Sequence, residues 1–334
     1  MMRNRTGIAI SIVVLINAGC TDRSGALRYV EGQLLNRNGD LSVLVEPFSL
    51  TPSKGGYIFA DTKAPVLYRF DMSFRLLGEI GRLGQGPGEY IAPWKVRQLG
   101  QSRLIVIDPA NIRLTVLDSL FQLETQWRIE YGNRRMLDAR TGPNGHIYVS
   151  QYREPDAIFS VYLDDGTQLG KFGEWPTEYV DALRIRANLC TFSFIKKRLY
   201  VAFSFFPLIR VYSLSGDLIE EHIWSSDTVR LLESELGDLF DMAETRRQRY
   251  TLVSASDAAD DSVLVLSGFR DMESCAVYVF DRRCNLVDEI IVRLPSNTDQ
   301  RFFDDMIISP HDGMLYGLLQ VDSGIVRVNW RNTP

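Results

Sequence analysis

Short apolar strands recur along this chain at fairly regular intervals. They centre on six positions, Ile58, Ile105, Ile147, Leu199, Val263 and Leu315, which are 47, 42, 52, 64 and 52 residues apart. Each is followed by a polar gap and a second apolar strand, which in most units ends in an Asp or Gly turn. Four-stranded sheets that repeat with a period in this range are typical of the blades of a β-propeller. The pattern therefore predicts an all-β, six-bladed β-propeller.

The repeats predict one domain, because no single unit could bury both faces of its own sheet. We place this propeller at residues 41–334. The last unit supplies only three strands, and an incomplete blade would expose an unpaired edge. A strand from the N-terminal side, within Leu41–Val45, is therefore expected to complete it.

The largest insertion, between blades four and five, has a helical pattern. Asp227 or Thr228 is a suitable N-cap, and Leu232 and Leu236 follow at helical spacing. We expect a short helix here that packs over the mouth of the central channel. A lid or a helix that docks a partner is the alternative.

The N-terminal residues have the pattern of an export signal. Met1–Arg5 is positively charged, and Ile8–Ile16 is apolar but too short to span a bilayer. We assign residues 1–19 to a signal peptide of the lipoprotein type and residues 20–40 to a polar tether.

The residues around the cleavage point support that assignment. Cys20 directly follows Ala18 and Gly19 and resembles the lipidated cysteine of the bacterial lipobox, which implies a lipid anchor at Cys20. Thr21, and not Asp, follows the cysteine, a pattern that resembles lipoproteins sorted to the outer membrane. An ordinary cleaved signal is the alternative.

Composition and charge narrow the classes of partner. The 334 residues carry a net charge of −5, and cleavage before Cys20 would remove Arg3 and Arg5, leaving 35 − 42 = −7. No basic run is longer than the Arg246–Arg249 cluster, so nucleic acid is not expected as a partner.

Besides the lipidated Cys20, three cysteines would remain after cleavage: Cys190, Cys275 and Cys284. Cys275 and Cys284 are predicted at opposite ends of one hairpin, roughly 15 Å apart at about 3.3 Å per residue. A disulfide cannot bridge that distance. We therefore expect free, buried thiols.

The stretch Gly81–Tyr90 contains four glycines within eight residues. A phosphate-binding loop needs a helix to begin inside the glycines, because the helix dipole attracts the anion. Pro87, Pro93 and the strand pattern that follows exclude that helix, so these glycines are expected to turn a corner between two blades. Glu89 is expected to cap loop amides and Tyr90 to pack between blades.

The same stretch, with the strands after it, carries a family resemblance. It is similar to the NHL-type six-bladed β-propeller, and within that type to a branch of exported bacterial lipoproteins, at Gly81, Gly84, Gly86, Pro87, Gly88, Glu89, Tyr90, Pro93, Asp108, Asn111, Arg113 and Asp118. The resemblance is strong over residues 57–121 and weaker over 146–330. It implies a binding platform, here anchored to the bacterial outer membrane on its periplasmic or surface side. We expect a monomer.

One rim of the predicted disc carries most of the long segments, namely the links between blades and the loops between second and third strands. Long insertions on one face usually form a binding face. We therefore expect non-enzymatic binding of an envelope protein, a peptide or a glycan at this rim. The candidate ligand contacts are Trp94, Arg97, Asp138 and Arg140. A structural subunit that only spaces its partners in an envelope complex is a further alternative.

Catalysis has less support in the sequence. The three histidines are predicted at different depths of different blades, and no Gly-x-Ser-x-Gly elbow occurs. Carboxylates near the axis are the exception: Glu46 and Asp304 are candidate metal ligands, and oxygen ligands suit calcium. Val45–Phe48 faintly resembles the first element of six-bladed lactonase-type enzymes, which implies a calcium-dependent hydrolase as the alternative function. No cofactor other than such a calcium ion is expected.

Overall fold

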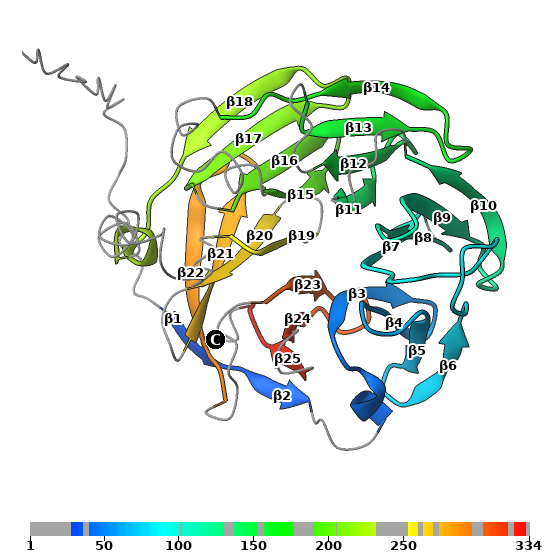
Figure 1. The fold of residues 1–334 in the computed structure, drawn as a ribbon. Helices are drawn as coiled ribbons and strands as arrows, with labels where there is room; N and C mark the ends of the chain where they lie inside the picture. The colour runs from blue at the N-terminus through cyan, green and yellow to red at the C-terminus, as the bar shows by residue number, and fades with distance from the viewer. Residues whose placement is uncertain are drawn as a thin grey trace, which may run out of the picture.

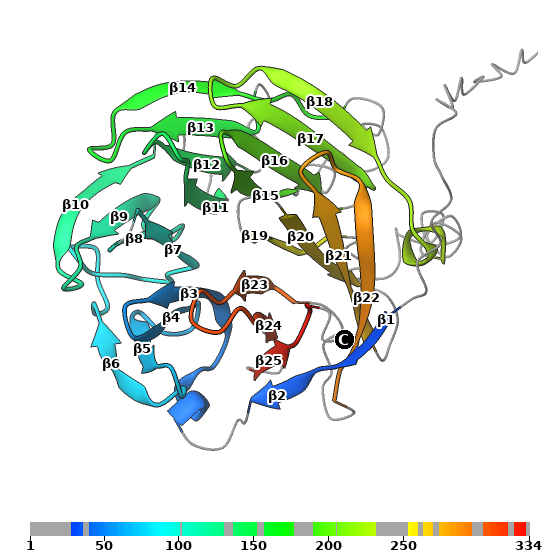
Figure 2. The same ribbon diagram turned by 180° about the vertical axis from the view of Figure 1, so that it is seen from behind.

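The computed structural model describes residues 28–35, 40–100, 102–129, 136–151, 157–176, 190–204, 206–231, 253–259, 263–269, 274–295, 303–319 and 324–331. Within these residues the chain forms 25 β-strands, numbered β1 to β25, and very little helix. The strands build six sheets that radiate from a central axis (Figure 1; Figure 2). The predicted all-β, six-bladed propeller is confirmed.

In blades one to three, four antiparallel strands follow one another from the axis outwards. Blade one contains β3 (Pro47–Ser53), β4 (Gly56–Asp61), β5 (Leu67–Asp71) and β6 (Leu76–Ile80). Blade two contains β7 (Lys95–Leu99), β8 (Arg103–Asp108), β9 (Arg113–Leu117) and β10 (Leu123–Arg128). Blade three contains β11 (Met136–Thr141), β12 (Ile147–Gln151), β13 (Phe159–Tyr162) and β14 (Gln168–Phe172).

Blades four to six repeat this order. Blade four contains β15 (Cys190–Ile195), β16 (Arg198–Phe203), β17 (Leu208–Ser213) and β18 (Leu218–Ile223). Blade five contains β19 (Ala255–Ala259), β20 (Val263–Phe269), β21 (Ser274–Asp281) and β22 (Leu286–Arg293). Blade six contains β23 (Asp305–Ile308), β24 (Leu315–Leu319) and β25 (Gly324–Val328).

The N-terminal segment completes the ring with two strands of its own. β2 (Gln33–Leu35) pairs antiparallel with β25 and is the fourth strand of blade six. β1 (Arg28–Glu31) pairs parallel with β22 and gives blade five a fifth, outermost strand. The chain thus covers the outer edges of two neighbouring blades before it enters blade one, and it protects those edges from pairing with other chains.

Two expectations for this segment are wrong. Leu41–Val45 contains no closing strand; Asp40–Val43 forms the 3₁₀ helix η1 instead. Its Leu41 is buried in the core beside blade one, and the Asp40 carboxylate accepts a hydrogen bond from the Leu76 backbone, so these residues fill the corner between blades. The fold also begins earlier than residue 41, because residues 28–35 lie in sheets where a polar tether was expected.

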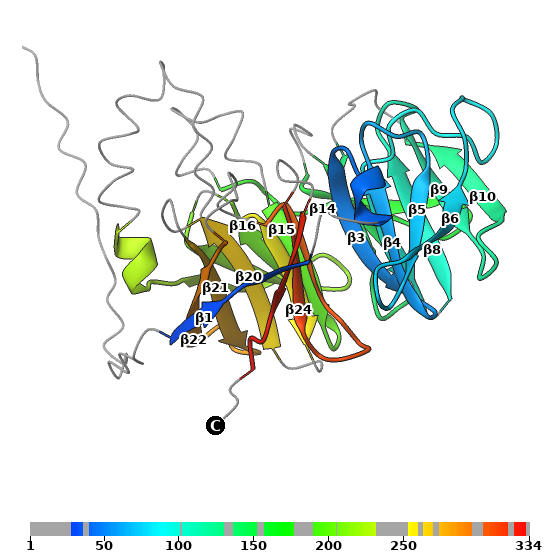
Figure 3. The ribbon, with the colours of Figure 1, turned by 90° about the horizontal axis from the view of Figure 1, so that it is seen from below.

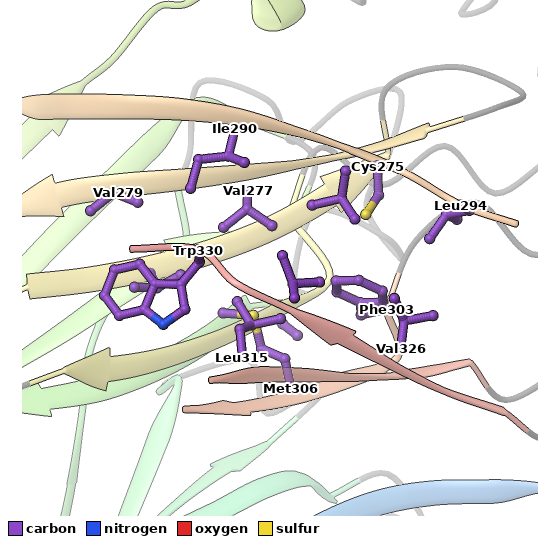
Figure 4. Close-up of a cluster of buried hydrophobic side chains, with 14 of the residues drawn as sticks. Cys275, Val277, Val279, Ile290, Leu294, Phe303, Met306, Leu315, Val326 and Trp330 are labelled. Carbon is purple, nitrogen blue, oxygen red and sulfur yellow. The ribbon is translucent and has the colours of Figure 1, made fainter. Parts of the chain in front are cut away.

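The hydrophobic core lies between adjacent blades. The middle strands are buried along their whole length, as β4 and β9 illustrate, since a blade covers each of their faces. Figure 4 shows one such layer between blades five and six, where Val277 and Ile290 face Met306 and Leu315. Outer strands such as β6 instead alternate between half-buried and exposed residues. This two-sided burial is the physical source of the repeat in the sequence.

The insertion between blades four and five begins as a helix, as predicted, at residues 227–231. Its N-cap lies one residue earlier than expected: the Ser226 hydroxyl accepts a hydrogen bond of 3.1 Å from the Val229 backbone. Leu232 and Leu236, like the whole signal peptide and Cys20, lie outside the described residues. Within the described residues, no helix has the length and apolarity needed to cross a membrane.

The three cysteines of the propeller are free and buried, as expected. Burial raises the pKa of Cys190 and of Cys284 to about 12. Both thiols therefore stay protonated and unreactive at neutral pH.

Candidate functional site

The innermost strands direct charged side chains at the axis of the propeller. We call the following set the axial network: Lys95 and Arg97 on β7, Asp138 and Arg140 on β11, Asp257 on β19 and Asp305 on β23. Residues two apart on a strand share a face, which is why β7 and β11 each supply a pair. Three cations meet three carboxylates, so their formal charges cancel.

Arg97 is the centre of this network. Its guanidinium forms two hydrogen bonds of 2.7 Å to the Asp305 carboxylate and one of 3.0 Å to Asp138. A further bond of 3.0 Å reaches the Ser49 hydroxyl on β3. Arg97 therefore ties its own blade to blades six, three and one.

These contacts fix the charge states of the buried carboxylates. Burial alone would raise the pKa of Asp305, but the positive charges of Arg97 and Lys95 outweigh it and hold that pKa well below its ordinary value. Burial would likewise raise the pKa of Asp138. The positive charges of Arg97 and Arg140 outweigh that effect, so the pKa of Asp138 is lowered. Both carboxylates are ionised at any physiological pH.

Arg140 extends the network to blades four and five. It donates to the Asp138 carboxylate at 3.3 Å, to the Ser193 hydroxyl on β15 at 3.3 Å and to the Ser256 carbonyl on β19 at 2.8 Å. Asp257 lies 3.6 Å from the same guanidinium. Burial raises the pKa of Asp257 in spite of that charge. With Arg97, Arg140 connects the inner strands of all six blades.

Below the network lies a cavity of about 520 Å³, which we call the axial cavity. Its walls come from the carboxyl-terminal halves of the inner strands, including Thr51, Arg97, Arg140, Ser193 and Asp257. The charged groups in these walls already bind one another, and apolar residues such as Phe194, Met306 and Ile308 line the rest, so the cavity offers a mixed surface with little net charge.

A second hollow of about 600 Å³ lies at the other end of the inner strands, between blades one and two. We call it the rim groove, and it is lined by Glu46, Phe48, Thr62, Gln85, Ile91, Ala92, Trp94, Pro109 and Ala110. The Phe48 and Trp94 rings meet edge to face, with centroids 4.7 Å apart. Glu46 forms an ion pair of 3.1 Å with Lys63, whose side chain is largely exposed.

The glycine-rich stretch builds one wall of the rim groove and turns a corner between blades one and two, as predicted. The Glu89 carboxylate accepts a bond of 2.7 Å from the Gly86 backbone, and Tyr90 is fully buried between blades one and two. From β9, Arg113 donates to the carbonyl oxygens of Gln85 and Glu89. These contacts hold the Gln85 backbone at the mouth of the groove.

The four predicted ligand contacts do not form one site. Trp94 lines the rim groove, whereas Arg97 and Arg140 line the axial cavity at the opposite end of the inner strands. Asp138 lies buried between these two arginines. Of the four predicted ligand contacts, Trp94 is therefore the one that lies beside an accessible hollow on the loop-rich rim.

The two candidate metal ligands also have other neighbours. Glu46 lines the rim groove and pairs with Lys63, and the carbonyl of Asp304 accepts a bond of 3.4 Å from Lys95. Among the residues that the structure describes, no group of three or more His, Cys, Asp or Glu side chains is placed to hold a metal ion.

Sequence reasoning missed Lys95 and Asp257 in the network and Phe48, Gln85 and Ala110 in the rim groove. A signal existed for the first pair, since a charged residue inside a strand that is otherwise buried needs a partner. The groove gave no comparable signal, because its residues come from a link and two loops that meet only in the folded ring.

No protein-family model and no curated protein sequence matches this chain. Solved structures do match it. Virginiamycin B lyase of Staphylococcus aureus is 12% identical with a TM-score of 0.56, covering 89% of this chain and 98% of its own. A protein of Bacteroides fragilis described as exported is 13% identical with a TM-score of 0.60, covering 91% and 96%.

Regucalcin of Agrobacterium tumefaciens, described as a calcium-binding protein, is 11% identical with a TM-score of 0.56, covering 92% of this chain and 98% of its own. These neighbours differ in what they do, and identities this low carry information on the fold alone. By its own sheets and by these neighbours, the chain is a six-bladed β-propeller.

Proposed function

We propose that this protein is a non-enzymatic binding propeller of the bacterial cell envelope, which recognises a protein, peptide or glycan through its loop-rich rim. The observation that carries the proposal is the rim groove. It combines two aromatic rings, Phe48 and Trp94, with a few polar groups, among them Glu46 and Gln85. Binding sites typically have such a mainly apolar lining, and the volume of about 600 Å³ is within their usual range.

The chemistry of the axis supports binding over catalysis. Catalytic acids and bases need groups that can reach a substrate. In the axial network, Arg97, Asp138 and Asp305 are nearly fully buried and bind one another. Their arrangement is suited to holding blades together.

The calcium-dependent, lactonase-type hydrolase is the second candidate, and two observations favour it. Glu46 lines the rim groove with its carboxylate near an open hollow, and the similar regucalcin is described as calcium-binding. A calcium titration of the chelator-treated protein distinguishes the two functions.

The envelope location is part of the proposal and rests on the sequence. The lipobox-like Cys20 and the NHL-type resemblance support an outer-membrane lipoprotein, and one structural neighbour is described as exported. Removal of the membrane anchor by Cys20→Ser should release the protein into the soluble fraction.

Site-specific photo-crosslinking in intact cells tests the rim groove. A benzophenone amino acid at Gln85, which is exposed at the groove, should capture a discrete partner, whether protein, peptide or glycan. The same group at Ser119, which is exposed in the β9–β10 turn at the opposite end of blade two, is the matched control.

A substitution that fills the groove completes the test. Ala110→Trp places an indole in the groove from an exposed position, so it should reduce capture at Gln85 at least about tenfold, which corresponds to 1.4 kcal/mol. Ser119→Trp should leave capture unchanged. Equal capture from Gln85 and Ser119, or capture that Ala110→Trp does not alter, would refute binding in the rim groove.

A further inference from the structure

The fold begins close to the predicted lipid anchor. β1 starts at Arg28, so only the seven residues 21–27 separate it from Cys20. Seven residues span at most about 25 Å even when fully extended. A propeller of this size is roughly 50 Å across, so the connection is shorter than the protein is wide.

The point where the chain enters the fold is firmly held. All four residues of β1 pair with β22, and the Arg28 guanidinium donates to the Asp288 carboxylate at 2.7 Å. Arg28 also donates to the Trp330 carbonyl, and the Gly32 backbone donates to the Arg293 carbonyl at 2.9 Å. The seven-residue connection is therefore attached to a rigid edge of blade five.

This edge lies on the circumference of the disc, away from both of its axial faces (Figure 1; Figure 3). In a ring of six blades, blade five is opposite blade two, which forms the rim groove together with blade one. The attachment point therefore lies across the axis from the groove.

The side chains on the attached edge suit a lipid surface. Tyr29 on β1 is 51% exposed, and the Arg293 guanidinium lies 5.0 Å from its ring centroid. Val287 on β22 is 58% exposed. Tyrosine is enriched at membrane interfaces. Arg293 also pairs with Glu31 on β1 at 3.3 Å, so the two charges offset each other and the exposed Tyr29 and Val287 are the groups that suit the bilayer.

We propose that the β1–β22 edge of blade five faces the lipid bilayer to which Cys20 is anchored, so that the disc stands on its edge and the rim groove, in blades one and two, lies in the half of the ring that is farther from that membrane. This inference rests on the proposed lipid anchor. A partner would therefore bind in the groove at a distance from the anchoring membrane.

Energy transfer from the protein to the bilayer tests this orientation. The full chain is produced with Val287→Cys or Ser119→Cys, labelled with a donor dye, and reconstituted in vesicles of phosphatidylethanolamine and phosphatidylglycerol that contain an acceptor lipid. Both positions are exposed, and the native thiols of the propeller are buried, so labelling is selective. Transfer from position 287 should exceed transfer from 119 about threefold or more, because the sites lie on opposite sides of a ring roughly 50 Å wide.

A longer connection is the internal control. Forty Gly/Ser residues inserted after Asp22 raise the mean reach from about 15 Å to about 40 Å. The difference between the two positions should then largely disappear.

The outcomes separate the orientation from the anchor. Equal transfer from both positions, in a protein that sediments with membranes and is released by Cys20→Ser, overturns the orientation and leaves the anchor intact. A full chain that stays soluble, or whose Cys20 thiol reacts with the dye, refutes the anchor and the orientation with it.

Discussion

The axial network and the rim groove meet at neighbouring residues, Lys95 at the start of β7 and Trp94 directly before it, yet they differ in charge and in burial. Lys95 points into a buried network whose charges cancel, and the preceding Trp94 lines an open hollow with few charges. The network joins six blades through the axis, whereas the groove involves two blades and the loops between them. Charged residues close to the axis of a propeller are thus not a sufficient sign of a functional site.

The axial network and the rim groove should also respond differently when a side chain is removed. A buried ion pair contributes little net stability, but the loss of one partner leaves the other charge buried and uncompensated. A half-exposed groove residue leaves no such charge behind. Substitutions in the network should therefore affect folding, and substitutions in the groove should affect binding.

Arg97→Met should produce the largest loss of stability. The change leaves the Asp138 and Asp305 carboxylates without their main partner, which should lower the free energy of unfolding by about 3–5 kcal/mol. Urea-induced unfolding at pH 7 measures it. Ala110→Trp, from an exposed position, should change stability by no more than about 0.5 kcal/mol. A loss of less than about 1 kcal/mol for Arg97→Met would show that the network does not hold the blades together.

Gly81→Ala should have the next largest effect and tests how the corner supports the groove. Gly81 has a φ of +88°, and an added Cβ would lie 2.4 Å from the ring of Tyr90. Strain and displacement of Tyr90 together should cost about 2–3 kcal/mol. Gly55 has a similar φ of +83° but open space around it, so Gly55→Ala should cost only about 1 kcal/mol. Equal losses for the two variants would show that Tyr90 adapts freely.

The fold was more predictable than the site, for a physical reason. Each blade buries both faces of its middle strands, so apolar runs such as Tyr57–Asp61 recur in the sequence wherever a blade recurs in space. The number of blades and the corner at Gly81–Tyr90 follow from such local patterns.

Contacts between distant segments left no such pattern. The closing strand was expected at Leu41–Val45 but lies at Gln33–Leu35, because three residues are enough to complete an edge and neither segment has a distinctive alternation. Trp94 and Arg97 were grouped with Asp138 and Arg140 from their predicted position near the axis, but Trp94 faces the rim groove and Arg97 the axial network. The groove neighbours of Trp94, such as Ala110, come from loops of other strands.

Acidification should change stability differently in the wild type and in Arg97→Met. The pKa values of Asp138 and Asp305 are lowered in the folded state, so their stabilisation is complete above their unfolded pKa of about 4 and is lost as the pH falls towards the folded values. Asp257, whose pKa is raised, acts in the opposite direction, but it is outnumbered. The wild type should thus lose stability between pH 5 and pH 3.

Arg97→Met should lose about 1–2 kcal/mol less over the same interval, because protonation relieves its uncompensated carboxylates. Surface carboxylates titrate in both proteins, so the difference between two urea-unfolding series isolates the network. Identical pH profiles would contradict the charge states described here.

Calcium should have the smallest effect of all, and this expectation separates the two candidate functions. A ligand bound only by the folded state adds roughly 2.7 kcal/mol at 100 times its dissociation constant, enough to raise the midpoint of thermal unfolding by some degrees. For a binding propeller, chelator-treated protein titrated with calcium should show no such rise. A rise that Glu46→Gln or Asp304→Asn abolishes, and that Glu124→Gln on the outer strand of blade two leaves intact, would instead support the lactonase-type reading. The rim groove would then be the mouth of a metal site, and its ligand a substrate.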